Sequence, residues 1–274
     1  MERTSLNFRT QPVKRRAFGT GTLSAIKFFL SLTVVVWIVA VAGRNIDYNW
    51  QWYRIPRYLY TVDEGHLLPG PILKGVWITL QITGWSLVLS MGLGLFAALL
   101  RLSRSFPGQL IARTYVEIVR NTPLLVQLFF LYFVVAPVLG ISRFQSAVFA
   151  LSLFEGAYAS EIIRAGIVSI HRGQWEAAYS LGLGGWATYK TVILPQAIRR
   201  VLPPLTSQAI SLIKDSALVS AIAVYDLTMQ GRTIISETFL TFEVWFTVAA
   251  IYLMITTALS FAVFLMKRSL GNNV

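Results

Sequence analysis

The chain has 274 residues, of which 55% are hydrophobic and 13% charged, and its mean hydropathy is +0.61. A soluble domain would carry about a quarter charged residues, so the composition favours an integral membrane protein. The net charge of +12 does not indicate nucleic-acid binding, because the basic residues flank apolar stretches. The chain has no cysteine, and its two histidines, His66 and His171, stand alone; disulfides are excluded, and neither a metal site nor a cofactor is expected.

The first apolar stretch, residues 23–42, follows a basic tail formed by residues 1–22. Lys14-Arg15-Arg16 ahead of an apolar run is a pattern shared with twin-arginine and ordinary signal peptides. We interpret the stretch as an uncleaved anchor helix followed by an external loop that ends at residue 71. The tryptophans and tyrosines of that loop are typical of the headgroup region, and contact with a soluble partner is the alternative.

Four further stretches have the length of about 20 apolar residues that a spanning helix needs: 72–100, 118–139, 145–166 and 244–266. Residues 204–225 form a weaker candidate, because this stretch carries several polar side chains. Read alone, it is also consistent with an amphipathic helix that lies on the membrane.

The distribution of Lys and Arg favours six spans. With the N-terminus inside, the cytoplasmic pieces 1–22, 101–115, 164–203 and 267–274 hold 15 basic residues, and the external pieces hold 5. This asymmetry follows the positive-inside rule. Without residues 204–225 as a span, Lys267 and Arg268 would lie outside. We therefore predict an all-α membrane protein with six transmembrane helices and both termini in the cytoplasm.

The longest cytoplasmic piece carries a motif with fixed spacing. Glu176-Ala177-Ala178 is followed after three residues by Gly182, and after nine more by Val192-Ile193-Leu194-Pro195. The alanines favour a short helix over residues 174–181, and Glu176 suits the helix dipole near its start. Gly182 and the glycines after it predict a sharp bend before a second short helix that ends near Pro195. An ordinary amphipathic interfacial helix is the alternative.

This block resembles the EAA loop of ABC importer permeases, with Val192 in place of the family's isoleucine as the only departure. Further motifs extend the resemblance over about residues 70–268, and together they are similar to permeases for polar amino acids of the glutamine, histidine and arginine type. These motifs are Glu117-x-x-Arg120-x-Thr122-Pro123-x-x-x-Gln127, Gly156-Ala157-Tyr158-x-x-Glu161-x-x-Arg164-x-Gly166, Ile213-Lys214-Asp215-Ser216 and Gln230-Gly231.

The resemblance implies a five-helix core of a type I ABC importer over residues 72–268, preceded by an extra helix and external loop (23–71) and followed by a short tail (269–274). The EAA loop, residues 171–200, would transmit the movement of an ATPase through six residues. The residues implied in this coupling are Glu176, Ala177, Ala178, Gly182, Leu194 and Pro195.

The resemblance also implies a set of partners. The chain would form half of a pathway with a second, identical or related, permease in a bacterial inner membrane, as a multi-pass protein surrounded by lipid. A cytoplasmic ABC ATPase homodimer would drive it, and a periplasmic binding protein would deliver polar or charged L-amino acids. The choice among these amino acids stays open, as does the choice between identical and related permease subunits.

The chain is not expected to be an enzyme. Residues 70–75 lack the order of a phosphate-binding loop, and no Ser/His/Asp grouping has a catalytic setting. ATP hydrolysis would therefore take place on another chain. A secondary transporter or channel, and a membrane scaffold without transport, are the alternative classes.

Polar residues inside the predicted spans point to the transport path, because a charge at the centre of a helix costs about 2.5–3.5 kcal/mol on insertion scales. The resemblance favours Asp215 as a substrate contact, and Glu155 is a second candidate from its position within residues 145–166. Lys214 and Gln127 complete the candidate set. Structural ion pairing is the alternative for the charged members.

Three further sets of residues allow structural interpretations. Glu117 with Arg120, and Glu161 with Arg164, have the i,i+3 spacing of helix-stabilising pairs. Thr122-Pro123 is expected to kink or start the third span. Small residues in the second span either line a permease dimer interface or pack within one subunit. They are Ser90, Gly92, Gly94 and Ala98.

Overall fold

The computed structural model describes residues 48–63 and 65–271, together with 29–31, Thr33, Val34, Trp37 and Val41. Residues 1–50 and 51–274 form two separate units, and each is considered by itself. The predicted tail 1–22 and most of the predicted first span lie outside the described residues. Those described within residues 23–42 are helical.

The second unit begins with short elements that the sequence analysis does not predict. A 3-10 turn, η1 (Trp52–Arg54), and one helical turn, α2 (Pro56–Leu59), lead into two antiparallel strands, β1 (Tyr60–Asp63) and β2 (His66–Pro69). Gly65 adopts φ +80 at the turn between them, a conformation that glycine adopts without strain. The all-α prediction is therefore wrong for this segment, although the hairpin is the only sheet among the described residues.

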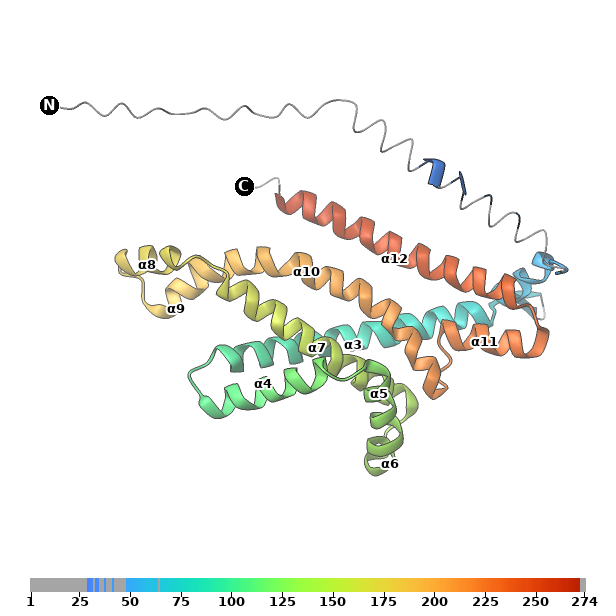
Figure 1. Ribbon diagram of the computed structural model, residues 1–274, viewed down its shortest axis with the longest axis horizontal. Coiled ribbons are helices and arrows are strands. Elements are labelled where there is room, and N and C mark those ends of the chain that lie inside the picture. Colours follow the sequence, from blue (N-terminus) through green and yellow to red (C-terminus); the bar gives the residue numbers. More distant parts are fainter. Residues whose placement is uncertain are drawn as a thin grey trace. The chain divides into compact units, whose positions relative to one another are not determined.

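Three long helices follow the predicted apolar stretches. They are α3 (Pro71–Leu102), α7 (Arg143–Val168) and α12 (Thr241–Gly271). Their positions confirm the helices predicted at 72–100, 145–166 and 244–266, and each is long and apolar enough to cross a membrane. In Figure 1 the three helices run along the same general direction.

The stretch predicted as one span over residues 118–139 is not a single helix. It is divided between the amphipathic α4 (Phe106–Arg120) and a run formed by α5 (Leu124–Phe129), the π-helical η2 (Phe130–Val135) and α6 (Ala136–Leu139). The two parts meet at an angle of 107°. Pro123 causes the break because it has no N–H to donate and disfavours a helical residue before it. The expectation that Thr122-Pro123 starts the apolar helix is confirmed.

The weaker candidate, residues 204–225, belongs to a longer and broken element. Helix α10 (Leu194–Asp215) passes into a 3-10 helix, η4 (Ser216–Ile222), and the chain then turns at Ala223, with φ 55, into α11 (Leu227–Thr238). Helix α11 packs on α3 and occupies part of the predicted external piece 226–243. By length and composition, three helices of the described part can cross a membrane, or four when the bent α4–α6 pair counts as one span.

The helix predicted to end near Pro195 instead continues. One turn, α9 (Gly185–Thr188), passes through the π-helical η3 (Tyr189–Ile193) into α10 without a break. Pro195 lies in the first turn of α10, where a missing N–H is tolerated, and the preceding π-helical turn accommodates its ring. This correction has a mechanical consequence, since the loop and the polar end of α10 become one continuous element.

The largest contact in the core joins α3 and α7. Ser90, Gly94 and Ala98 are buried on the face of α3 that meets α7, whereas Gly92 is exposed. A Cβ on Gly94 would lie 2.6 Å from the Cβ of Ala159. The small residues other than Gly92 therefore pack within one subunit, which settles the alternative for these three.

Alanine at position 94 is expected to destabilise the protein, because neither Ala159 nor the adjacent α7 backbone can move away at low cost. Overpacking of this kind costs about 1–3 kcal/mol. Gly92→Ala is the matched control, since a Cβ added to this glycine of the same helix would meet nothing within 4 Å. Thermal unfolding in detergent should show a lower midpoint only for Gly94→Ala. Equal midpoints for the two variants would contradict the assigned contact.

Candidate functional site

The predicted motif loop folds as a short helix that ends in a glycine turn. Helix α8 (Arg172–Ser180) begins at His171, whose Nδ1 accepts a hydrogen bond from the Gly173 N–H at 3.0 Å. At its end Gly182 adopts φ +77, and the N–H groups of Gly182 and Leu183 donate to the carbonyls of Tyr179 and Ala178. This pattern is a Schellman motif, which closes a helix and reverses the chain. The predicted helix and bend are confirmed.

Contacts with the neighbouring helices hold this loop in place. The Gln196 side chain of α10 donates to Gln174 at 3.0 Å, and Arg200 donates to the Ser169 carbonyl at 2.6 Å. The Trp175 ring lies 6.3 Å from that of Tyr189, and burial raises the pKa of the Tyr189 phenol. A small apolar cluster of Ile167, Ile170, Ile193 and Ala197 fills the base. The loop is thus rigidly joined to α7 and α10.

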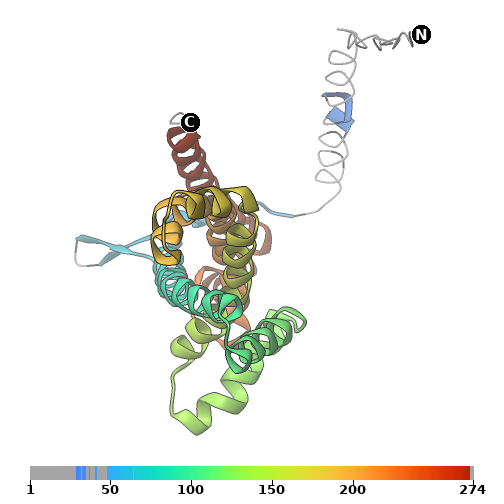
Figure 2. The ribbon, with the colours of Figure 1, turned by 90° about the vertical axis from the view of Figure 1, so that its left-hand side faces the viewer.

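The far side of the loop presents exposed side chains. Leu181 is 81% exposed and Trp186 77%. Glu176 is exposed, and its carboxylate lies 3.0 Å from the Arg172 guanidinium. Among the six predicted coupling residues, Ala178 alone is buried. Figure 1 places α8 and α9 at one end of the helices, and Figure 2 looks onto that end.

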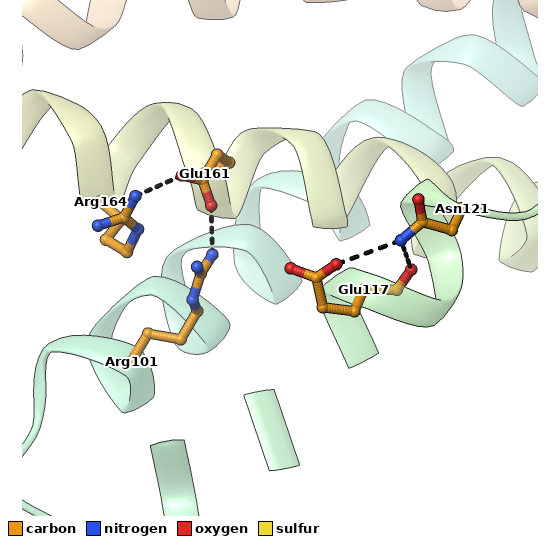
Figure 3. A network of polar contacts seen from close by, with 5 residues as sticks. All are labelled: Arg101, Glu117, Asn121, Glu161 and Arg164. Carbon is orange, nitrogen blue, oxygen red and sulfur yellow. Dashed lines mark hydrogen bonds and ion pairs between the residues drawn. The ribbon is translucent and has the colours of Figure 1, made fainter. Parts of the chain in front are cut away.

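An ion network joins α3 to α7 near this loop (Figure 3). Glu161 accepts hydrogen bonds from Arg164, as its spacing predicts, and also from Arg101 at the end of α3. The predicted Glu117–Arg120 pair is wrong. Glu117 instead accepts from the Asn121 side chain at 3.2 Å, and the Arg120 guanidinium lies 5.3 Å from the centre of the Tyr158 ring. Helix α4 carries both residues, but they point to different neighbours.

A second polar group lies inside the helical core, between α7 and α10. Glu155 is only 2% exposed, and its Oε1 has no hydrogen-bond partner among the described residues. The side chains of Gln208 and Asp215 lie near this carboxylate. The structure therefore places Glu155 of α7 and Asp215 of α10 in the same region of the core. Asp215 itself is half-buried.

The two other candidates for substrate contact lie in different settings. Lys214 is exposed and forms no ion pair within the described part of the chain, although it neighbours Asp215. Gln127 is half-buried, and its amide nitrogen donates to the Val119 carbonyl and to Thr122 Oγ1, both at 2.7 Å. The amide therefore stabilises the bend between α4 and α5.

Comparison with known proteins places the chain in a family. Residues 90–272 match the family described as "Binding-protein-dependent transport system inner membrane component". The chain belongs to this family. It is 40% identical over 200 residues to the glutamine transport system permease protein GlnP of Escherichia coli K12, covering 72% of this chain and 91% of that protein. It is 46% identical over 167 residues to the L-cystine transport system permease protein TcyB of Bacillus subtilis 168, covering 60% and 71%.

A solved structure agrees in both fold and sequence. A crystal structure of an amino acid ABC transporter with histidines matches this chain with a TM-score of 0.69 and 40% identity. The match covers 73% of this chain and 94% of the chain in that structure. The fold is thus that of a type I ABC permease, which confirms the resemblance of the EAA loop and the expectation that the chain is not itself an enzyme.

The sequence analysis does not predict two polar neighbours of Glu161 and Glu155, namely Arg101 and Gln208. Arg101 lies 60 residues before Glu161, and Gln208 lies more than 50 after Glu155, so no local spacing relates either pair. Gln208 carried a weak signal as a polar residue within a predicted span. Arg101 carried none, because a basic residue at the end of a span is already explained by topology.

Proposed function

We propose that the chain is the translocation subunit of an ATP-driven bacterial uptake system for polar or charged L-amino acids. It lies in the inner membrane as a multi-pass protein, with six spans and both termini in the cytoplasm. A second permease subunit completes the pathway, an ABC ATPase homodimer binds the EAA loops, and a periplasmic binding protein delivers the substrate.

The continuity between the loop and α10 supports this proposal most strongly. Helical structure runs from Gly185 in the loop to Asp215 inside the core. A continuous helical element of this kind can transmit a movement of the loop to the core, as coupling to a separate ATPase requires. ATP binding would draw the two loops together and turn the site from inward-facing to outward-facing, and hydrolysis would reset it. Glu176, Ala177, Gly182, Leu194 and Pro195 would form or shape the surface that meets the ATPase, with Ala178 packed beneath it.

We infer that Glu155 and Asp215 receive the cationic part of the substrate. A buried carboxylate oxygen without a partner is costly, and a ligand cation would satisfy it. Two acids in one place favour an amino acid with a positively charged side chain over a neutral one. Lys214 cannot pair with Asp215 along one helix face, because neighbouring residues on a helix diverge; it remains a candidate for the substrate carboxylate. Gln127 would act from the bend of α4 and α5.

Glu155→Gln tests the proposed preference. The change keeps the size and polarity of the side chain and removes one charge, so uptake of L-arginine should weaken relative to L-glutamine by about tenfold or more, the range of a charged hydrogen bond. Competition uptake of the two labelled amino acids measures the ratio. Glu117→Gln, on the exposed side of α4, is the control and should leave the ratio unchanged. A ratio unaffected by Glu155→Gln would remove this residue from the site.

Reconstitution tests the function as a whole. Proteoliposomes that contain the permease with its ATPase should take up labelled amino acid only when ATP and the binding protein are both supplied. A secondary transporter would accumulate substrate from an ion gradient with this chain alone, and a scaffold would show no uptake under any condition. Uptake without ATP would therefore overturn the proposal.

A further inference from the structure

A groove lined by both polar and apolar residues lies between η4 and α11, outside the sites described above. It has a volume of about 390 Å³, within the usual range of small-molecule sites. Its lining includes Ser220, Met229, Arg232, Thr233 and Ser236. Neither the motif loop nor the Glu155 group contributes to it, so it needs its own explanation.

Arg232 is the charged residue of this groove. Its side chain is exposed, and no hydrogen bond or ion pair to it is found among the described residues. A guanidinium offers five N–H donors in a planar fork that matches the two oxygens of a carboxylate. Placed in a groove with these donors unused, Arg232 has the chemistry of a carboxylate receptor.

The hydroxyl groups of the groove offer hydrogen-bond acceptors, whereas Arg232 offers donors. Ser220, Thr233 and Ser236 each donate their hydrogen to a backbone carbonyl of their own helix, namely those of Ala217, Met229 and Thr233, at 2.8 to 3.0 Å. Their oxygen lone pairs remain available as acceptors. A group that carries several N–H donors, such as an ammonium, therefore complements these oxygens.

The groove also lies far from the motif loop. A Cβ on Gly75, near the start of α3, would lie 2.8 Å from the Gln230 side chain of α11. At the other end of α3, Leu99 and Leu102 line a pocket together with Trp175 and Tyr189 of the motif loop. Figure 1 accordingly shows α11 at the end of the helices opposite to α8 and α9. Asp215 ends α10, and Ser220 follows it by about 10 Å at the rise of a 3-10 helix.

From these observations we propose that the η4–α11 groove is an amino-acid subsite on the outer side of the pathway, in which Arg232 binds the α-carboxylate and the hydroxyl oxygens accept from the α-ammonium. This subsite recognises the α-carboxylate and α-ammonium groups, which all amino acids share. The substrate reaches it before it reaches Glu155 and Asp215, which bind the substrate side chain. The inference rests on the proposed function only for the direction of transport and the class of substrate.

Ligand binding tests the subsite directly. The purified permease–ATPase complex, without binding protein, is titrated with labelled L-arginine and with argininamide, which lacks the carboxylate charge. The wild-type complex should bind the acid at least tenfold more tightly than the amide, and Arg232→Gln should bring the two affinities together. Arg232→Lys keeps the charge without the fork and should restore part of the preference.

Controls separate the possible failures. Arg113→Gln removes an exposed arginine of α4 and should leave the preference for the acid intact. ATP-driven uptake by the wild-type complex tests the proposed function independently, so an unchanged preference in Arg232→Gln would overturn the subsite alone. Loss of the permease dimer in Arg232→Gln, seen by size-exclusion chromatography with light scattering, would also overturn it, because Arg232 would then contact the second permease instead of substrate.

Discussion

Substituting Glu176 with lysine is expected to reduce amino-acid uptake by at least about 100-fold while the protein still inserts and folds. The carboxylate is 65% exposed and pairs with Arg172 on the surface of α8. Exposed pairs of this kind contribute about 0–1 kcal/mol, so the fold loses little. Uptake is lost because position 176 lies on the surface that would meet the ATPase. A reversed charge there opposes binding of the ATPase by several kcal/mol. Uptake in proteoliposomes and ATPase activity of the same preparation measure the two effects.

The control for this variant removes the same ion pair from its other side. Arg172→Gln leaves the charge of Glu176 in place and should retain most of the uptake. Uptake that falls equally in both variants would assign the effect to the stability of α8. Normal uptake with lysine at position 176 would count against coupling through this loop.

Neutralising Glu161 is expected to have the largest effect on stability. Glu161→Gln leaves the guanidinium groups of Arg101 and Arg164 without their shared counterion, and the Arg101 side chain is only 12% exposed. Breaking a buried pair from one side costs about 3–5 kcal/mol, because the remaining charge stays desolvated. The Glu161 and Arg164 side chains are 28% and 31% exposed, so the cost lies toward the low end of this range. The thermal unfolding midpoint in detergent should fall clearly, because the ion pair between α7 and the end of α3 is lost.

The matched control lies beside this network in Figure 3. Glu117→Gln removes an exposed acid whose carboxylate accepts a hydrogen bond from Asn121 at the end of the same helix, so the midpoint should change little. Replacing Arg101 with methionine in the Glu161→Gln background should recover part of the loss, since the most buried charge is then gone. If Glu117→Gln and Glu161→Gln unfold at the same temperature, the network does not stabilise the fold.

Much of this fold is predictable because apolar length and motif spacing are local properties. The helices α3, α7 and α12 follow from unbroken apolar stretches, and the α8 turn follows from Gly182, which adopts a positive φ that most residues avoid. Pro123 predicts the break that follows α4, but the amphipathic α4 itself is not predicted. Its apolar residues are interrupted by Arg113, Glu117 and Arg120, so they form no continuous apolar stretch. Part of the helix also falls within the predicted cytoplasmic piece 101–115.

The remaining errors concern tertiary context. The sequence predicts that a helix ends near Pro195. In the structure the π-helical turn η3 leads directly into α10, and Pro195 lies in the first turn of that helix. Glu155 and Asp215 are candidates because charges within spans are costly, but only the packing of α7 on α10 places them in the same region of the core. The contact of Arg101 with Glu161 likewise depends on the close approach of α3 and α7. Neither arrangement has a local sequence signal.

A single cysteine tests the central claim most directly, because the chain contains none of its own. Ala177→Cys places a thiol on the exposed face of α8. In membranes that contain the co-expressed ATPase, a short bifunctional thiol reagent should join this position to a cysteine introduced in the cleft of the ATPase, in a yield that changes when ATP is added. Efficient labelling of the thiol by a water-soluble reagent in the assembled complex, with no cross-link to the ATPase, would contradict the assignment of this loop.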